Sequence, residues 1–249
     1  MWDNTRAKRG ILCQRWVLFL ALLVPFAEPR PGHIAGEVYG EELAFPTDVR
    51  YEAAKHGVVY RLDAPAIVTI RAGIDGGPLL KNVLVGPSRP AGEHVEPWDG
   101  MDESGVVDVV SQKGFLLQGE AVSAAERDAT VRWDARPSGT HEGLKLRIDL
   151  QGAMERTKAE VPFVAGKTSI EVSVDGPPDR DAGKPVHEII FFVDFQFLRE
   201  LEGESLPATL SWDTGEVGEG EHIITVNVVA PGGEVSTGSA RVVVDNSRQ

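Results

Sequence analysis

Strict alternation of apolar and charged residues is the feature that most constrains this chain. It is clearest in Leu144-Lys145-Leu146-Arg147-Ile148-Asp149-Leu150 and recurs at Val68–Arg71 and Ile170–Val174. Successive side chains of a β strand point to opposite faces, so the pattern predicts strands with one face on a core and one in water. Denser apolar runs predict central strands covered on both faces, at 189–193, 223–229 and 242–244.

The segments between these runs carry turn residues rather than helical patterns. The chain holds 27 glycines and 16 prolines, many in clusters such as Gly76-Gly77-Pro78 and Pro231-Gly232-Gly233. Short helical turns are expected only at Ala121–Arg127 and Phe197–Glu202. Strands separated by such turns at roughly ten to fifteen residues are typical of sandwiches. We therefore expect an all-β fold with two immunoglobulin-like β-sandwich domains in tandem after an N-terminal signal segment.

The N-terminus has the pattern of an export signal. Four basic residues, the last of them Arg15, precede an apolar run from Trp16 to Ala27 that is too short to span a bilayer. We expect residues 1–27 to be a signal peptide. Because Pro25-Phe26-Ala27 is a poor cleavage site, an uncleaved N-terminal anchor is the alternative, with membrane contact through residues 16–27 alone. Residues 28–43 are predicted to be an extended leader. The protein is therefore expected to be secreted, cell-surface or periplasmic.

Charge and cysteine content exclude several functions. The formal net charge is −13, and removal of residues 1–27 would change it to −16 because four basic residues and one acidic residue are lost. Such a surface repels a phosphate backbone, so nucleic acid is not an expected partner. The one cysteine, Cys13, lies in the signal segment. Without it the exported chain has no disulfide, no thiolate zinc site and no cysteine nucleophile.

Residues Ala44 to about Ala124 resemble the immunoglobulin-like domain known from the flagellar hook-capping protein FlgD and found on many exported bacterial proteins. The resemblance rests on the order of five short segments, which are 59–62, 66–70, 77–80, 91–94 and 98–105. The last, Trp98-Asp99-Gly100-Met101-Asp102-Glu103-Ser104-Gly105, is the most specific. In it we expect Trp98 to close one end of a core and the acidic and glycine residues to form a tight reversal.

Residues 128–249 resemble a second bacterial immunoglobulin-like module. The matching segments include Gly166–Ile170, Ile189–Asp194, Leu210–Thr214, Gly220–Val226 and Val242–Asn246. The connection from Phe195 to Pro207 is longer and more charged than this resemblance implies. A domain boundary is expected within Ala121–Asp128, giving sandwiches over 44–124 and 128–249. The two resemblances together imply a scaffold or accessory role.

Two acidic clusters could hold calcium. Asp99, Asp102 and Glu103 form one, and Asp175, Asp179 and Asp181 form the other. Carboxylate oxygens are the ligands that calcium prefers, but neither spacing is that of a known calcium loop. Solvated turns are therefore the favoured interpretation, with calcium as the alternative and no other cofactor expected.

No catalytic motif stands out. Gly166-Lys167-Thr168 lacks the earlier glycine of a phosphate-binding loop and is interpreted as a hairpin turn, and the tryptophans of the Trp-Asp pairs at 98, 133 and 212 are interpreted as core residues at strand ends. We expect no enzyme. The predicted function is a structural or interaction protein that contacts another protein or a cell-envelope component. The alternatives are a carbohydrate-binding module, a calcium-dependent adhesion module or an accessory part of an extracellular hydrolase.

Overall fold

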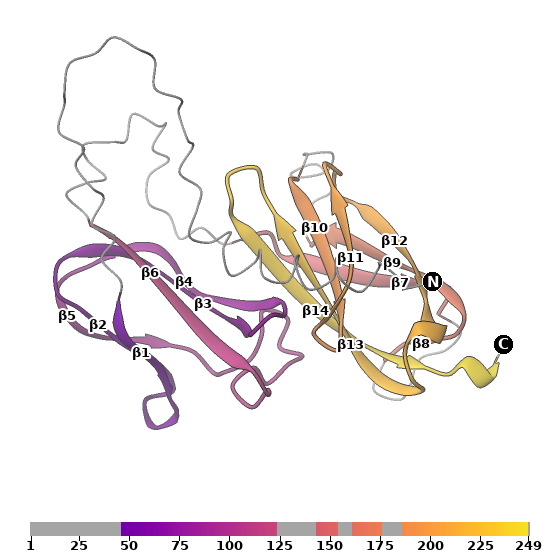
Figure 1. Cartoon of the computed structure of the whole chain (residues 1–249), viewed down its shortest axis with the longest axis horizontal. Helices are drawn as coiled ribbons and strands as arrows, with labels where there is room; N and C mark the ends of the chain where they lie inside the picture. The colour runs from indigo at the N-terminus through magenta and orange to yellow at the C-terminus, as the bar shows by residue number, and fades with distance from the viewer. Residues whose placement is uncertain (1–45, 124–142, 154–160, 176–185, 249) are drawn as a thin grey trace, which may run out of the picture. The chain divides into compact units, whose positions relative to one another are not determined.

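The structure is a computed structural model that describes residues 46–123, 143–153, 161–175 and 186–248 (Figure 1). The predicted signal segment and leader, Asp179, Asp181 and Trp133 lie outside these ranges. Within them the regular elements are β strands and short 3₁₀ turns: β1 (Thr47–Glu52), η1 (Ala53–Lys55), β2 (Gly57–Leu62), β3 (Ala66–Ile74), β4 (Leu79–Arg89), β5 (Gly92–Pro97), β6 (Phe115–Ser123), β7 (Leu146–Gln151), β8 (Phe163–Val164), β9 (Lys167–Val174), β10 (Glu188–Val193), β11 (Gln196–Glu202), β12 (Ala208–Asp213), η2 (Thr214–Glu216), β13 (Gly220–Val229), β14 (Val235–Val244) and η3 (Asn246–Arg248). The described part of the chain has no helix long and apolar enough to cross a bilayer. The expected all-β class is confirmed.

The first six strands form the N-terminal sandwich. One sheet has the order β1-β2-β5 and the other β4-β3-β6, and all pairings are antiparallel. The side chains of β2 and β3 that face inward are buried between the two sheets. Tyr60 and Ile70, for example, are both 0 % exposed. Trp98, directly after β5, packs on the same core. The predicted role of this tryptophan as a core residue at a strand end is confirmed.

The remaining strands form the C-terminal sandwich. A three-stranded sheet, β12-β9-β7, faces a five-stranded sheet, β11-β10-β13-β14-β8, across a second core that includes Phe191 and Trp212. In chain order β7, β9, β10, β12, β13 and β14 take the places of strands A, B, C, E, F and G of an immunoglobulin-like sandwich. β11 extends the sheet beside C, and the two-residue β8 runs parallel to β14.

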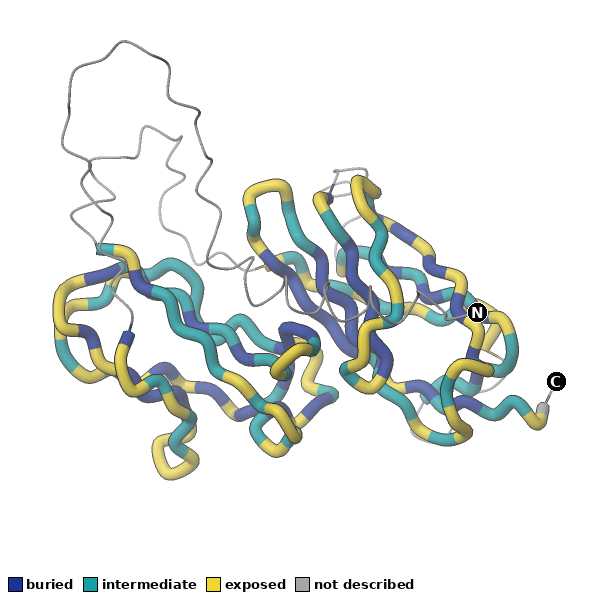
Figure 2. The backbone as a smooth tube through the Cα atoms, in the orientation of Figure 1, coloured by how far each residue is buried: buried dark blue, intermediate teal, exposed yellow. Residues whose placement is uncertain are grey.

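Several strand predictions are confirmed in detail. β7 has alternating half-buried and exposed residues, as the pattern at 144–150 predicts, although the strand begins at Leu146. β10 and β13 contain unbroken buried runs, 189–193 and 224–228, visible in dark blue in Figure 2. The two expected helical turns are wrong where the structure describes them. Residues 121–123 of the first belong to β6, and the rest of it lies outside the described residues. Phe197–Glu202 lies in β11, which pairs with β10 through a two-residue reversal at Asp194 and Phe195.

A buried polar seam explains why β13 is covered on both faces. The outer face of β13 and β14 carries Thr225, Asn227, Thr237 and Ser239, each at most 7 % exposed. The side chain of Asn227 accepts from the N–H of Leu79 at 2.9 Å and donates to its carbonyl at 2.8 Å, and Thr237 donates to the same carbonyl. These bonds join β4 of the N-terminal sandwich to the C-terminal sandwich.

Further contacts extend the seam. Asn82 donates to the carbonyl of Val235, the N–H of Ser239 donates to the hydroxyl of Ser104, and Arg241 donates to the carbonyl of Val106. Phe195 and Ile223 of the C-terminal sandwich pack on the N-terminal core. The described residues of both sandwiches belong to one compact unit. The expected division at 121–128 into two domains stays a prediction.

Candidate binding site

The acidic turn after β5 is organised by bonds within the turn itself. The indole N–H of Trp98 donates to the carbonyl of Met101, whose own N–H donates to Asp99. Gly100 and Gly105 have φ of 85° and 67°, the left-handed region that glycine adopts without strain. The predicted tight reversal between residues 99 and 105 is therefore confirmed.

The turn does not bring the three calcium candidates onto one point. One oxygen of the buried Asp102 carboxylate accepts from the N–H groups of Val106 and Val107, while Glu103 pairs with Lys81 at 3.1 Å and Asp99 is bonded to Met101. The described residues contain no group of three or more His, Cys, Asp or Glu side chains arranged to hold a metal. Each carboxylate thus has a structural role in the turn, and calcium binding stays a prediction without a formed site.

Gly166-Lys167-Thr168 is a turn, but not the hairpin turn that the sequence favoured. Gly166 has φ of 62°, and its N–H donates to Asn246. The strand before the turn, β8, pairs with β14, whereas the strand after it, β9, pairs with β7 and β12. The chain therefore crosses from one sheet to the other at this turn, because neither strand has the other as its partner.

A buried ionic cluster closes one side of the N-terminal sandwich. Arg89, at the end of β4, holds the carboxylate of Glu96 on β5 through two bonds of 2.8 and 3.0 Å, and Tyr60 donates to the same carboxylate at 2.9 Å. The ring of His94 stacks on Tyr60. Burial raises the pKa of Glu96, but the bonds from Arg89 and Tyr60 and the charge of Arg89 outweigh it, so the net pKa is lowered. β4 and β5 are edge strands of opposite sheets, so this cluster joins the two edges.

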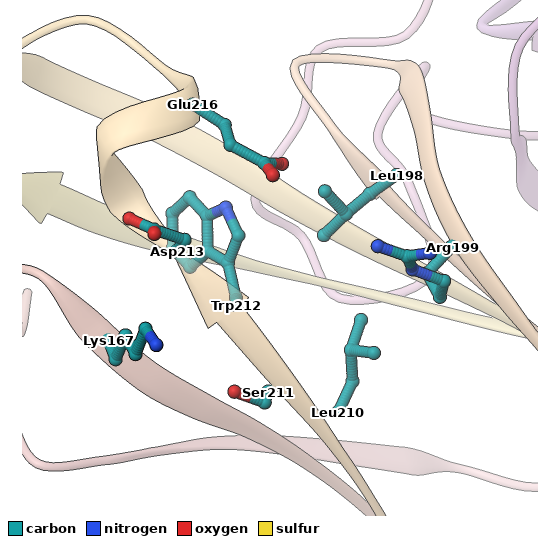
Figure 3. A pocket seen from close by; sticks show the side chains of 8 residues that line it. All are labelled: Lys167, Leu198, Arg199, Leu210, Ser211, Trp212, Asp213 and Glu216. Atoms are coloured by element: carbon teal, nitrogen blue, oxygen red, sulfur yellow. The ribbon is translucent and has the colours of Figure 1, made fainter. Parts of the chain in front are cut away.

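The same gap in the C-terminal sandwich has no such closure. Its edges are β11 and β12, the strands that correspond to β4 and β5. Between them lies a hollow of about 190 Å³ (Figure 3). Its lining comes from both edge strands, from the start of β9 and from η2: Lys167, Leu198, Arg199, Leu210, Ser211, Trp212, Asp213 and Glu216. Within the described part of the chain, no ion pair joins Arg199 to an acid of β12 across this gap as Arg89 joins Glu96.

Trp212 leaves a hydrogen-bond donor unused beside this hollow. Its side chain is almost fully buried, with 1 % of the residue exposed, and the indole Nε1 has no hydrogen-bond partner among the described residues. Figure 3 shows that nitrogen on the side of the ring that faces Glu216 and Leu198. A buried indole N–H without a partner costs about 1–3 kcal/mol. Trp212 lines the hollow, so this buried donor lies next to it, and a bound acceptor that reached the indole nitrogen would be favourable.

A histidine–acid pair fixes the reversal between β10 and β11. His222 Nδ1 lies 2.6 Å from Asp194 Oδ2, and Nε2 lies 2.8 Å from the carbonyl of Gly218, so both ring nitrogens face acceptors. Burial lowers the pKa of His222, but these two bonds and the charge of Asp194 raise it more, and the net pKa is above its ordinary value. The pair favours the imidazolium form, in which both nitrogens donate.

The sequence did not identify the gap between the edge strands β11 and β12 as a site. Trp212 was correctly placed in a core, but nothing in Leu-Ser-Trp-Asp shows that its indole lacks a partner. The signal that could have found the gap is comparative: Arg89 and Glu96 form an ion pair across the β4–β5 edges, while among the described residues Arg199 of β11 forms none with an acid of β12. That comparison requires the strand pairing, which the missed β11 concealed.

Comparisons with known proteins leave the family open. No family model and no curated protein matches the chain. Similar solved structures include fibronectin(III)-like modules of CbhA from Clostridium thermocellum, at 18 % identity over 40 % of this chain and 96 % of that chain, with a TM-score of 0.27. CopC from Methylosinus trichosporium OB3b gives 16 % identity over 41 % of this chain and 94 % of that chain, also at 0.27. A Ca²⁺-stabilised adhesin of an Antarctic bacterium that binds ice gives 10 % identity over 78 % and 45 %, at 0.27. Scores at this level decide nothing about function, so the class, an all-β protein with immunoglobulin-like sandwiches, rests on the strand order itself.

Proposed function

We propose that this chain is an exported, non-catalytic interaction protein that presents two β-sandwiches, joined by the buried polar seam, to another protein or to a cell-envelope component. The observation that carries the proposal is the buried polar seam. Asn227 and Thr237 satisfy both backbone groups of Leu79, with four further buried or half-buried bonds nearby. A structure that fixes the orientation of two sandwiches is suited to presenting surfaces at a set distance rather than to enclosing a substrate.

The exposed apolar side chains support a contact role. Four large ones are exposed in the described ranges: Val95, Leu116, Val122 and Phe197. Phe197 is the one exposed aromatic among those residues. A carbohydrate-binding surface uses several exposed aromatic rings in a row, so the protein-contact role is the better supported of the two. Export, and a position outside the cytoplasm, belong to the same proposal and are supported by the N-terminal basic and apolar pattern.

The FlgD-type assignment of residues 44–124 is also part of the proposal. It is supported by the turn at 98–105, where Trp98 packs against Tyr51 edge-to-face at a centroid distance of 5.6 Å while Asp102 bonds to two backbone N–H groups. The hook-capping role is not carried over to this chain.

Site-specific photo-crosslinking in the source organism tests the interaction role. A photoreactive residue is introduced at Phe197, at Val95 or at Val122 in the full-length chain, with the exposed Asp63 as the matched polar control. We expect a discrete covalent adduct from at least one apolar position and none from Asp63. Equal labelling at all four positions, or no adduct at any of them, would contradict the interaction role.

A further inference from the structure

From the gap between β11 and β12, we propose that the free edge of β12 accepts an extended segment of a partner protein as an added β strand. The inference rests on the proposed interaction function and names the class of partner for it. The first observation is topological. In immunoglobulin constant-type sandwiches a fourth strand, D, lies beside strand E. In this chain β12 takes the place of E, and the described residues place no strand beside its outer edge.

The hollow borders that edge and reaches both faces of β12, with Lys167 of the neighbouring β9 also in its lining. It is lined by consecutive residues of β12, from Leu210 to Asp213, and by Leu198 and Arg199 of β11. Because neighbouring residues of a strand point to opposite faces, a hollow that touches four in a row borders the backbone edge itself. Its volume of about 190 Å³ is well above the about 10–15 Å³ that one bridging water needs. The space suits a short length of extended chain.

The polar groups of the hollow match a peptide. The orphan indole N–H of Trp212 requires an acceptor, which a backbone carbonyl supplies. Lys167 and Arg199 provide two positive charges, and Asp213 and Glu216 provide two negative ones. This balance suits a neutral ligand that both donates and accepts, as the peptide group does, rather than a simple anion or cation. Main-chain bonds give affinity in strand addition, and pockets for alternate side chains give specificity.

Charge indicates that the occupant is a different protein. The chain carries a formal net charge of −13, so a second copy would be repelled as a whole. The partner segment is therefore expected to be neutral or basic overall. In the N-terminal sandwich the matching gap between β4 and β5 is bridged by Arg89 and Glu96, so strand addition is expected at β12 and not at β5.

The test begins with a displayed library of random eight-residue peptides selected on the full-length protein, with the Arg199→Glu, Glu216→Lys double variant as the counter-selection. An enriched peptide is then synthesised in three forms: unmodified, N-methylated at every odd residue, and N-methylated at every even residue. In an added strand only alternate N–H groups face the neighbour. We therefore expect one methylated form to lose about tenfold or more in affinity and the other to bind nearly as well as the unmodified peptide.

The indole ¹H–¹⁵N signal of Trp212 provides the second readout. It is expected to shift on adding the unmodified peptide, together with backbone amide signals of 208–213. Equal loss in both methylated forms, no loss in either, no enriched peptide, or an unmoved Trp212 signal would each overturn the proposal. A shift of the Trp212 signal with N-acetylglucosamine and not with peptide would overturn it in favour of a sugar subsite. Crosslinks at Val95 or Val122 alongside any of these results would leave the proposed interaction function standing.

Discussion

The side-chain amide of Asn227 pairs with the backbone of Leu79 as one β strand pairs with another, although the two residues are 148 positions apart. One amide provides both the acceptor and the donor, at 2.9 and 2.8 Å, and Asn227 is fully buried. A buried polar residue that is fully bonded fixes one geometry, because any displacement leaves donors and acceptors without partners. The seam therefore both joins the two sandwiches and favours one orientation of β4 relative to β13.

Replacement of Asn227 tests the seam. Asn227→Ala leaves the N–H of Leu79 buried without a partner and is expected to lower the free energy of unfolding by about 2–3 kcal/mol. Urea unfolding followed by far-ultraviolet circular dichroism measures the change. Asn82→Ala, which removes a half-buried bond to Val235 and a longer one of 3.4 Å from Arg71, is the control, with an expected cost of about 1 kcal/mol. Equal losses of unfolding free energy in the two variants would show that the bonds between Asn227 and Leu79 stabilise the fold no more than the bond between Asn82 and Val235.

The ionic cluster of the N-terminal sandwich predicts acid sensitivity. Because the pKa of Glu96 is lowered in the folded state, its contribution to stability is present above its ordinary pKa of 4.5 and is lost as the pH falls through the folded-state value. Glu96→Gln is expected to cost about 2–3 kcal/mol at pH 7 and much less near pH 3. Thermal unfolding across this range measures it. The exposed Glu93→Gln is the control, with a cost below about 0.5 kcal/mol at every pH.

The His222–Asp194 pair predicts the opposite pH dependence. The pKa of His222 is raised in the folded state, so its contribution is complete below the ordinary value of 6.5 and is lost as the pH rises through the folded-state pKa. The difference in unfolding free energy between the wild type and His222→Gln is expected to be largest near about pH 5.5 and to shrink above neutrality. Denaturant unfolding at a series of pH values measures it. A difference that stays constant with pH would contradict the pairing.

Calorimetric unfolding tests whether calcium binds to the acidic turn at residues 99–105. Because Asp102 is already bonded to two backbone N–H groups, calcium is expected to leave the unfolding midpoint unchanged relative to chelator. Asp102→Ala is expected to lower the midpoint by about 2–8 °C, because it removes the acceptor for both groups. Asp99→Ala, which removes one exposed bond, is the control with a smaller effect. A midpoint raised several degrees by calcium would restore the metal-binding hypothesis.

The alternation of apolar and polar residues correctly predicted the strands that have one face in water. It did not predict structure that depends on contacts between residues far apart in the sequence. β7 follows its alternation, as does β9 with Ile170 and Val172 inward. β11 was missed because Phe197, Leu198 and Leu201 have helical spacing, whereas the strand is imposed by the reversal at Asp194 and Phe195, both with positive φ and neither a glycine. The run at 223–229 predicted a strand covered on both faces, but not what covers it, because Leu79, the partner of Asn227, is 148 positions away in the sequence.

The candidate edge was hidden for a related reason. A tryptophan in an alternating strand predicts burial, which Trp212 confirms at 1 % exposure. Whether its indole finds a partner depends on η2 and β11, which reach it from elsewhere in the chain. The hydrogen-bond balance of a buried side chain is set by its neighbours in space, and one sequence does not give them.

The polar seam also limits how this protein can be recombined. Tandem immunoglobulin-like sandwiches are often treated as independent domains that can be reordered or exchanged between proteins. In a C-terminal sandwich moved alone, the buried polar side chains Asn227, Thr237 and Thr225 would be exposed on an open sheet face. In the N-terminal sandwich left behind, the N–H of Leu79 at the start of β4 would lose the acceptor that Asn227 provides. The pair of sandwiches is therefore the smallest piece of this chain that can be moved between proteins with its surfaces intact.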